Sequence, residues 1–153
     1  MRRLSGALAG ALSLVAVSAC TPRDKGHAAY ATNCGICHHG GEGMPGETPP
    51  LRGRLDRIAA TELGRRYLQH VLLNGVSGPI HAGGEPYSGE MPSFRRLDDP
   101  TIAAILTWLC SRGDSTVAPV FTANDIALAR RETLSPGMVW DERAHLDRVT
   151  PLP

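Results

Sequence analysis

The sequence has few aromatic residues and almost no net charge, and both shortages restrict its function. Its 153 residues include only two tryptophans, three tyrosines and two phenylalanines, beside 17 glycines and 12 prolines. Such a chain builds a modest apolar core for its length, which suits a fold completed by a cofactor. The formal charge of +1 gives no support for nucleic-acid binding.

Cysteine is also scarce, and its spacing excludes two kinds of site. Cys34 and Cys37 form a close pair, whereas Cys20 and Cys110 are isolated. A structural zinc site would need a second pair at ligand spacing, and a thioredoxin-like redox site would need a βαβ pattern around the pair. The sequence contains neither.

The close pair belongs to the pentapeptide Cys34-Gly35-Ile36-Cys37-His38. Two cysteines separated by two residues and followed at once by histidine are the pattern for covalent attachment of a c-type haem. The thiols add across the two vinyl groups, and the imidazole of His38 binds iron. Because no second such motif and no internal repeat occurs, we expect one haem.

The first residues predict export and a lipid anchor. Arg2 and Arg3 precede an apolar run over residues 4–17, which is short for a membrane span of ~20 residues. The tetrapeptide ending at Cys20 resembles the lipobox of bacterial lipoproteins, in which this cysteine is acylated. Ordinary signal cleavage and an uncleaved anchor are the alternatives. We expect a signal peptide, a lipidated tether and a location on the periplasmic side of a bacterial membrane, with boundaries at 1–19 and 20–25.

A helix is predicted just before the haem motif, with Gly26, Tyr30 and Cys34 four residues apart on one face. Together with the haem motif, this pattern resembles class I cytochromes c. The resemblance implies an all-α fold in which the N- and C-terminal helices cross around one covalently bound haem. In that family the glycine permits the close crossing, and Trp108 takes the place of an aromatic residue at the same contact.

A methionine loop extends the resemblance. Residues 87–94 read Y-S-G-E-M-P-S-F and are similar to the family's ligand loop, which implies Met91 as the second iron ligand. A thioether is a soft, neutral ligand, and His/Met ligation raises the reduction potential. Met44 is too close in sequence to His38 to reach the opposite haem face, and Met138 lies in the tail. A second histidine ligand is the alternative, from His39, His70 or His81.

The loop after the haem motif contains Pro49-Pro50-Leu51, which is similar to the family's Pro-x-Leu. There a proline carbonyl accepts a hydrogen bond from the iron-binding histidine, and Pro49 fits that spacing better than Pro50. We also expect Tyr87 to hydrogen-bond near a haem propionate, with a partly exposed loop tyrosine as the alternative.

The starts of three further helices are predicted from residues that can cap a helix N-terminus. Thr61, Asp98 and Thr122 can each cap the start of a helix. Residues 76–90 are rich in glycine and predict a loop.

The domain organisation follows from these elements. We assign a cytochrome domain to 26–132 and expect 133–153 to be a peripheral or disordered tail. We expect Cys110 to be buried and unreactive.

The methionine loop is followed by the helix that contains Trp108 and then by a segment over 120–131 that ends in arginine. This order is similar to that of cytochrome subunits serving membrane-associated dehydrogenases. The resemblance implies an electron carrier, not an enzyme, that moves single electrons between a dehydrogenase or other redox partner and the respiratory chain. An oxidase or another cytochrome would be the acceptor. The alternative is a haem enzyme, or a gas- or peroxide-responsive cytochrome, in which Met91 leaves the iron site open.

Overall fold

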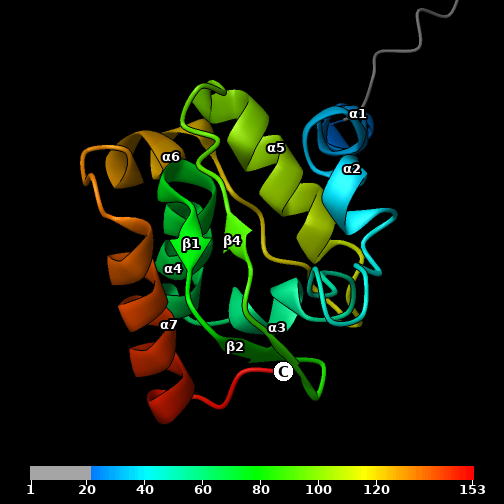
Figure 1. The fold of residues 1–153 in the computed structure, drawn as a ribbon. Helices are drawn as coiled ribbons and strands as arrows, with labels where there is room; N and C mark the ends of the chain where they lie inside the picture. Colours follow the sequence, from blue (N-terminus) through cyan, green and yellow to red (C-terminus); the bar gives the residue numbers. More distant parts are fainter. Residues whose placement is uncertain (1–21) are drawn as a thin grey trace, which may run out of the picture.

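The computed structural model describes residues 22–153, with side chains from residue 25 onward. Helices make up most of it, and two short strand pairs lie along one side of them (Figure 1). The predicted signal peptide and Cys20 lie outside this range. No helix within residues 22–153 is long and apolar enough to cross a bilayer. The elements are α1 (Pro22–Asn33), α2 (Gly35–His38), α3 (Leu55–Ile58), α4 (Glu62–Asn74), β1 (Val76–Ser77), β2 (Ile80–Ala82), β3 (Glu85–Tyr87), β4 (Glu90–Met91), α5 (Asp99–Cys110), α6 (Ala123–Ala129) and α7 (Pro136–Val149).

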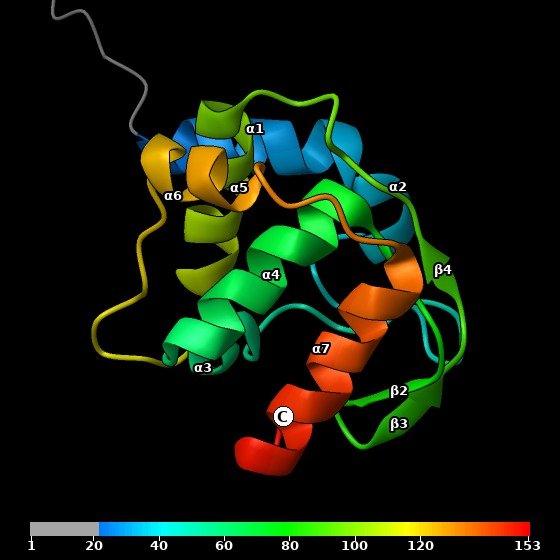
Figure 2. The same ribbon diagram turned by 90° about the vertical axis from the view of Figure 1, so that its left-hand side faces the viewer.

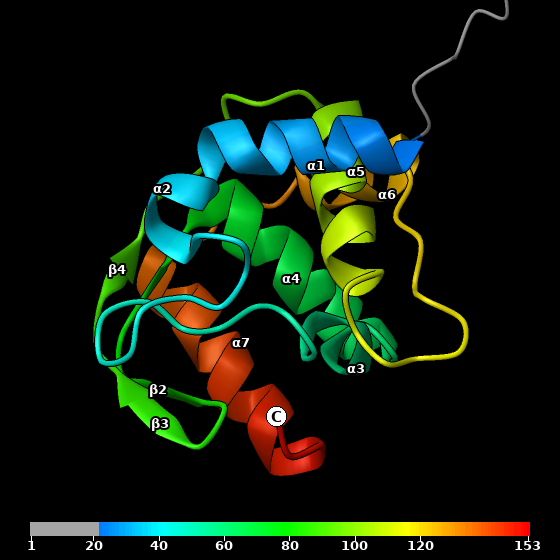
Figure 3. The same cartoon turned by 90° about the vertical axis from the view of Figure 1, so that its right-hand side faces the viewer.

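The crossing of α1 and α5 depends on a glycine (Figure 3). A methyl group on Gly26 would overlap the Ala104 carbonyl oxygen and lie 2.7 Å from Cβ of Trp108. The Trp108 ring in turn lies 4.7 Å from that of Tyr30 and 5.0 Å from that of His27, between ring centroids. The predicted all-α class I cytochrome c fold is therefore confirmed, including the close crossing of its two helices.

The predicted caps are present at three helix starts. The side chains of Thr61 and Asp98 accept hydrogen bonds from Gly64 N and Thr101 N. Thr122 forms a reciprocal capping box at the start of α6. Each cap satisfies backbone amides that a helix leaves unpaired in its first turn.

Two sequence predictions at the N-terminal side need correction. Helix α1 begins at Pro22, so the predicted tether over 20–25 is partly helical. Proline suits the first helical turn because its missing N–H has no intrahelical partner there. The predicted loop over 76–90 contains two antiparallel strand pairs, β1 with β4 and β2 with β3.

The prediction of a peripheral or disordered tail over 133–153 is wrong for α7, which lies against α4 and beside β1 (Figure 1). Val139 and Leu146 on this helix are 0% and 2% exposed and belong to the core. Trp140 Nε1 donates a 2.6 Å hydrogen bond to the Pro79 carbonyl. The helix was missed from the sequence because Ser135 and Pro136, which are typical of loops, here cap the helix and form its first residue.

Candidate haem-binding site

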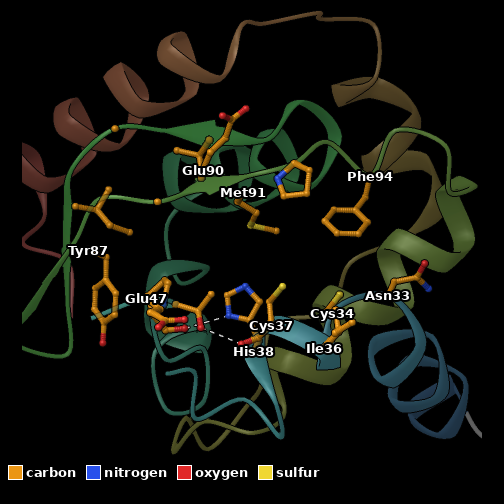
Figure 4. Close-up of a pocket in the computed structure, with 17 residues that line it drawn as sticks. Asn33, Cys34, Ile36, Cys37, His38, Glu47, Tyr87, Glu90, Met91 and Phe94 are labelled. Carbon is orange, nitrogen blue, oxygen red and sulfur yellow. Dashed lines mark hydrogen bonds between the residues drawn. The ribbon is translucent and has the colours of Figure 1, made fainter. Parts of the chain in front are cut away.

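A cavity of about 210 Å³ opens between two parts of the chain that are distant in sequence. One wall comes from the end of α1, the haem motif and the loop to Pro49. The other comes from residues 76–94, which include β1, the turn into β2, and β4. Figure 4 shows both walls, with side chains from each directed into the space between them.

The haem motif forms a tight helical turn on one wall. Cys34 N donates to the Tyr30 carbonyl at 2.8 Å, and His38 N donates to the Cys34 carbonyl at 2.9 Å. This turn brings both thiols and the imidazole to the same cavity (Figure 4). Cys34 is buried and Cys37 is exposed, and burial raises the pKa of the Cys34 thiol to about 11.

The orientation of the His38 ring is fixed by the backbone. Its Nδ1 lies 3.1 Å from the Pro49 carbonyl oxygen, the hydrogen bond that was predicted. Because a carbonyl can only accept, Nδ1 carries the proton and Nε2 is left with a free lone pair. Burial also lowers the pKa of His38, which favours the neutral ring that a metal requires. The Pro50 carbonyl instead accepts from Arg54 Nη1 at 2.6 Å.

Met91 lies on the opposite wall and faces His38 across the cavity (Figure 4). It sits in β4, paired with Val76 of β1. Within residues 22–153, neither Met44 nor Met138 lines the cavity, and they are 37% and 51% exposed. An imidazole nitrogen and a thioether sulfur on facing walls are the ligand set of low-spin cytochromes c.

The three histidines considered as alternative ligands lie elsewhere. His39 is exposed, with a φ of 51°, and His81 is exposed on β2. His70 is fully buried, and its Nδ1 lies 2.9 Å from Glu142 Oε2. None of the three lines the cavity.

Tyr87 lines the cavity and is 6% exposed, which differs from the partly exposed loop residue considered as the alternative. Its burial follows from the pairing of β3 with β2, which sets Tyr87 opposite Ile80, another lining residue.

Two buried arginines near the cavity were missed from the sequence. Arg54 and Arg143 are each 6% exposed, and no Asp or Glu side chain of the described residues lies within 4 Å of either guanidinium. Arg54 Nη2 has no hydrogen-bond partner. Burial, followed by the nearby charge of Arg143, lowers the pKa of Arg54 to about 10. No sequence signal separates these residues from surface arginines, because arginine is seldom buried.

The unpaired Nη2 of Arg54 bears on whether haem fits this site. Arg54 Nη1 donates to the Pro50 carbonyl, next to the loop that holds His38, and its Nε donates to the Pro153 carbonyl at 2.6 Å. A buried donor without an acceptor is costly, so Arg54 Nη2 favours a bound group that supplies an acceptor oxygen. Haem carries two propionate carboxylates, and the residues present therefore fit it. When bound, the haem would supply an iron centre that takes up and releases one electron.

Cys110, the remaining cysteine of the described residues, is buried and unreactive. Cys110 is 1% exposed, and burial raises the pKa of its thiol to about 12. Within residues 22–153, no group of three His, Cys, Asp or Glu side chains could hold a separate metal ion.

Comparison with known proteins agrees with this geometry. A family model described as "Cytochrome C oxidase, cbb3-type, subunit III" matches residues 21–109. The chain is 40% identical over 118 residues to "Cytochrome c-552" of Thermus thermophilus, covering 74% of this chain and 90% of that relative. A second "Cytochrome c-552", from a named strain of the same species, matches with the same identity over 80% of its length. The chain therefore belongs to this family, as an electron-carrying c-type cytochrome with covalently bound haem.

Proposed function

We propose that the chain is a monohaem electron carrier whose haem is bound by thioethers at Cys34 and Cys37, with His38 and Met91 as axial ligands. The observation that carries this proposal is the facing arrangement of His38 and Met91 across one cavity (Figure 4). The single CxxCH motif of the sequence supports a count of one haem.

Two protein ligands leave no open position for a substrate, so electrons would pass through the haem edge. The rim of the cavity suits this route. Ile36 is 86% exposed, and Glu47 and Glu90 are also exposed on lining positions. Apolar and acidic groups at the rim favour a partner with basic groups around an apolar contact.

The proposal places the protein on the periplasmic side of a bacterial membrane, anchored by acylated Cys20. The lipobox-like sequence before Cys20 supports this location. Helix α1 begins at Pro22, so the anchor would hold the domain close to the bilayer. Electrons would then move over short distances between membrane-associated partners.

A dehydrogenase or another redox protein is the proposed donor, and an oxidase or another cytochrome of the respiratory chain is the proposed acceptor. The family description, which names an oxidase subunit, supports an oxidase among the partners. The proposal of a dehydrogenase as the donor is supported by the similarity in segment order to cytochrome subunits that serve membrane-associated dehydrogenases.

Optical spectra of the holoprotein test the proposal. The ferric form should be low-spin, with the weak sulfur-to-iron band at the red edge of the spectrum, and the ferrous form should not bind CO at neutral pH. A high-spin ferric form that binds CO readily on reduction would favour the open-site alternative instead.

A further inference from the structure

Beside the loop that carries Met91, the side chains of Arg95 and Arg130 each donate a hydrogen bond to the backbone carbonyl of the other. Arg130 is the C-cap residue that follows α6, and its guanidinium donates to the carbonyls of Arg95 and Leu97, both at 2.7 Å. Its Nε also pairs with Asp99 Oδ1 at 2.7 Å. In return, Arg95 Nη1 donates to the Arg130 carbonyl at 3.0 Å. We call this pair, Arg95 and Arg130, the arginine clasp.

Arg95 extends the arginine clasp to two more parts of the chain. Its Nη2 donates to Asn74 Oδ1 at 2.8 Å, at the end of α4, and to the Glu132 carbonyl at 2.7 Å. The arginine clasp therefore ties the segment after Met91 to α4, to α6 and to the start of α5. In Figure 2 this segment runs from β4 to the start of α5, beside α6.

Arg95 of the arginine clasp lies four residues beyond Met91, on a segment without helix or strand. On its other side, Met91 is held by β1, and Gly75 permits this close approach, since a Cβ there would lie 2.5 Å from the Met91 carbonyl oxygen. Phe94 N also donates to the Leu72 carbonyl at 2.8 Å. An opening of the loop that carries Met91 out of the cavity together with this segment would strain the bonds of the arginine clasp.

We propose that Arg95 and Arg130 are positioning residues that hold the Met91 thioether in the haem cavity. This inference rests on the proposed ligation of iron by Met91. The guanidinium of Arg130 uses all three nitrogens on acceptors of one five-residue segment, a fit that lysine cannot reproduce. Because the bonds are made by a charged donor, loss of even one should change the opening equilibrium of the loop about tenfold.

Binding of imidazole to the ferric holoprotein at neutral pH measures this opening, since imidazole can reach iron only when Met91 leaves. Arg130→Gln should increase the apparent affinity for imidazole at least tenfold and weaken the sulfur-to-iron band, while covalent haem content stays at the wild-type value. Arg131→Gln is the matched control, because Arg131 is the exposed neighbour, and it should remain within twofold of wild type. Met91→Ala sets the upper limit.

Three further outcomes decide the inference. Arg130→Lys should resemble Arg130→Gln, and wild-type behaviour of the lysine variant would show that charge alone suffices and overturn it. Arg95→Gln removes the bonds that Arg95 donates, and it replaces Arg130→Gln as the test if that variant does not fold. Unchanged imidazole binding in Arg95→Gln would also overturn the inference. If wild type itself lacks the sulfur-to-iron band and binds imidazole like Met91→Ala, then the ligand assignment fails, and the inference with it.

Discussion

The Nδ1 atom of His38 donates to the carbonyl oxygen of Pro49 across 3.1 Å, and this bond determines which ring nitrogen faces the cavity. Since Nδ1 is occupied, only Nε2 can bind a metal. A carbonyl acceptor also makes the imidazole a stronger donor and prevents rotation of the ring. The loop that carries Pro49 thus holds His38 in one orientation and one tautomer.

Covalent attachment should depend on both cysteines of the cavity. Cys34→Ala and Cys37→Ala should each lose most or all haem on acid-acetone extraction, because one or both thioethers cannot form. Cys110→Ala, in which a buried thiol far along the chain is removed, should keep its haem. Retention of haem at wild-type yield by both Cys34→Ala and Cys37→Ala would refute the attachment sites.

Met91 should set the reduction potential without being needed for attachment. Met91→His should keep covalent haem, remain low-spin and lower the potential by on the order of 0.1 V, within the ~0.8 V that axial ligation spans. Met91→Ala should bind CO when reduced. Met44→Ala is the control, since Met44 does not line the cavity. An unchanged potential in Met91→His would mean that another residue is the ligand.

Arg54 should raise the reduction potential through its charge. A buried cation stabilises ferrous over ferric iron, because the ferrous centre is less positive, and burial at 6% exposure limits screening by water. Arg54→Met should lower the potential, measured by redox titration, by on the order of tens of millivolts. Arg57→Met, which changes an exposed residue of α3, the helix that Arg54 precedes as N-cap, should shift it far less. Equal shifts in the two variants would argue against a specific role.

Asp56 should make stability depend on pH in the acid range. Burial alone would raise the pKa of this carboxyl, but hydrogen bonds from Ser115 Oγ at 2.6 Å and from Ser115 N at 3.0 Å, with those of nearby backbone amides, hold it below its ordinary value. A depressed pKa stabilises the folded state above pH ~4 and ceases to do so as the pH falls through the folded value.

Asp56→Asn should therefore be less stable than wild type at pH 7 by about 1–3 kcal/mol in denaturant unfolding. The difference should shrink as the pH is lowered from 5 towards 2. Asp114→Asn, a nearby exposed aspartate, should follow the wild-type curve. A constant difference at every pH would exclude ionisation of Asp56 as the cause.

Lipidation should depend on Cys20, whose thiol is the proposed acyl acceptor. Acyl chains contribute ~0.8 kcal/mol per buried methylene, so Cys20→Ser should release the domain from membranes or block its processing. Fractionation and mass spectrometry of the mature N-terminus measure this. A soluble wild-type protein that begins downstream of Cys20 would rule out the anchor.

The residues that gather at the cavity were predictable because short motifs carry their chemistry. The haem motif, Pro49 and Met91 each lie in a stretch of a few residues whose spacing can be interpreted without the fold. Arg54 and Arg143 were missed because their burial depends on contacts between distant segments. Arg143 Nη2, for instance, donates to the His81 carbonyl.

The arginine clasp was missed for a related reason. Its acceptors are mostly backbone carbonyls, which every residue has, so side-chain identity does not reveal them. Helix α7 was missed because its charged residues outnumber the apolar ones that face the core, and Pro136 looked like a loop residue rather than a helix start.

The two tryptophans of the chain occupy two different junctions. Trp108 packs between α1 and α5, and Trp140 binds the Pro79 carbonyl where α7 meets the turn before β2. Indole emission responds to local packing, so replacing either one by phenylalanine leaves a probe of a single junction. Haem quenches the emission of nearby indoles by energy transfer, so a rise in emission from either single-tryptophan variant would report that its junction, the helix crossing or α7, has moved away from the haem.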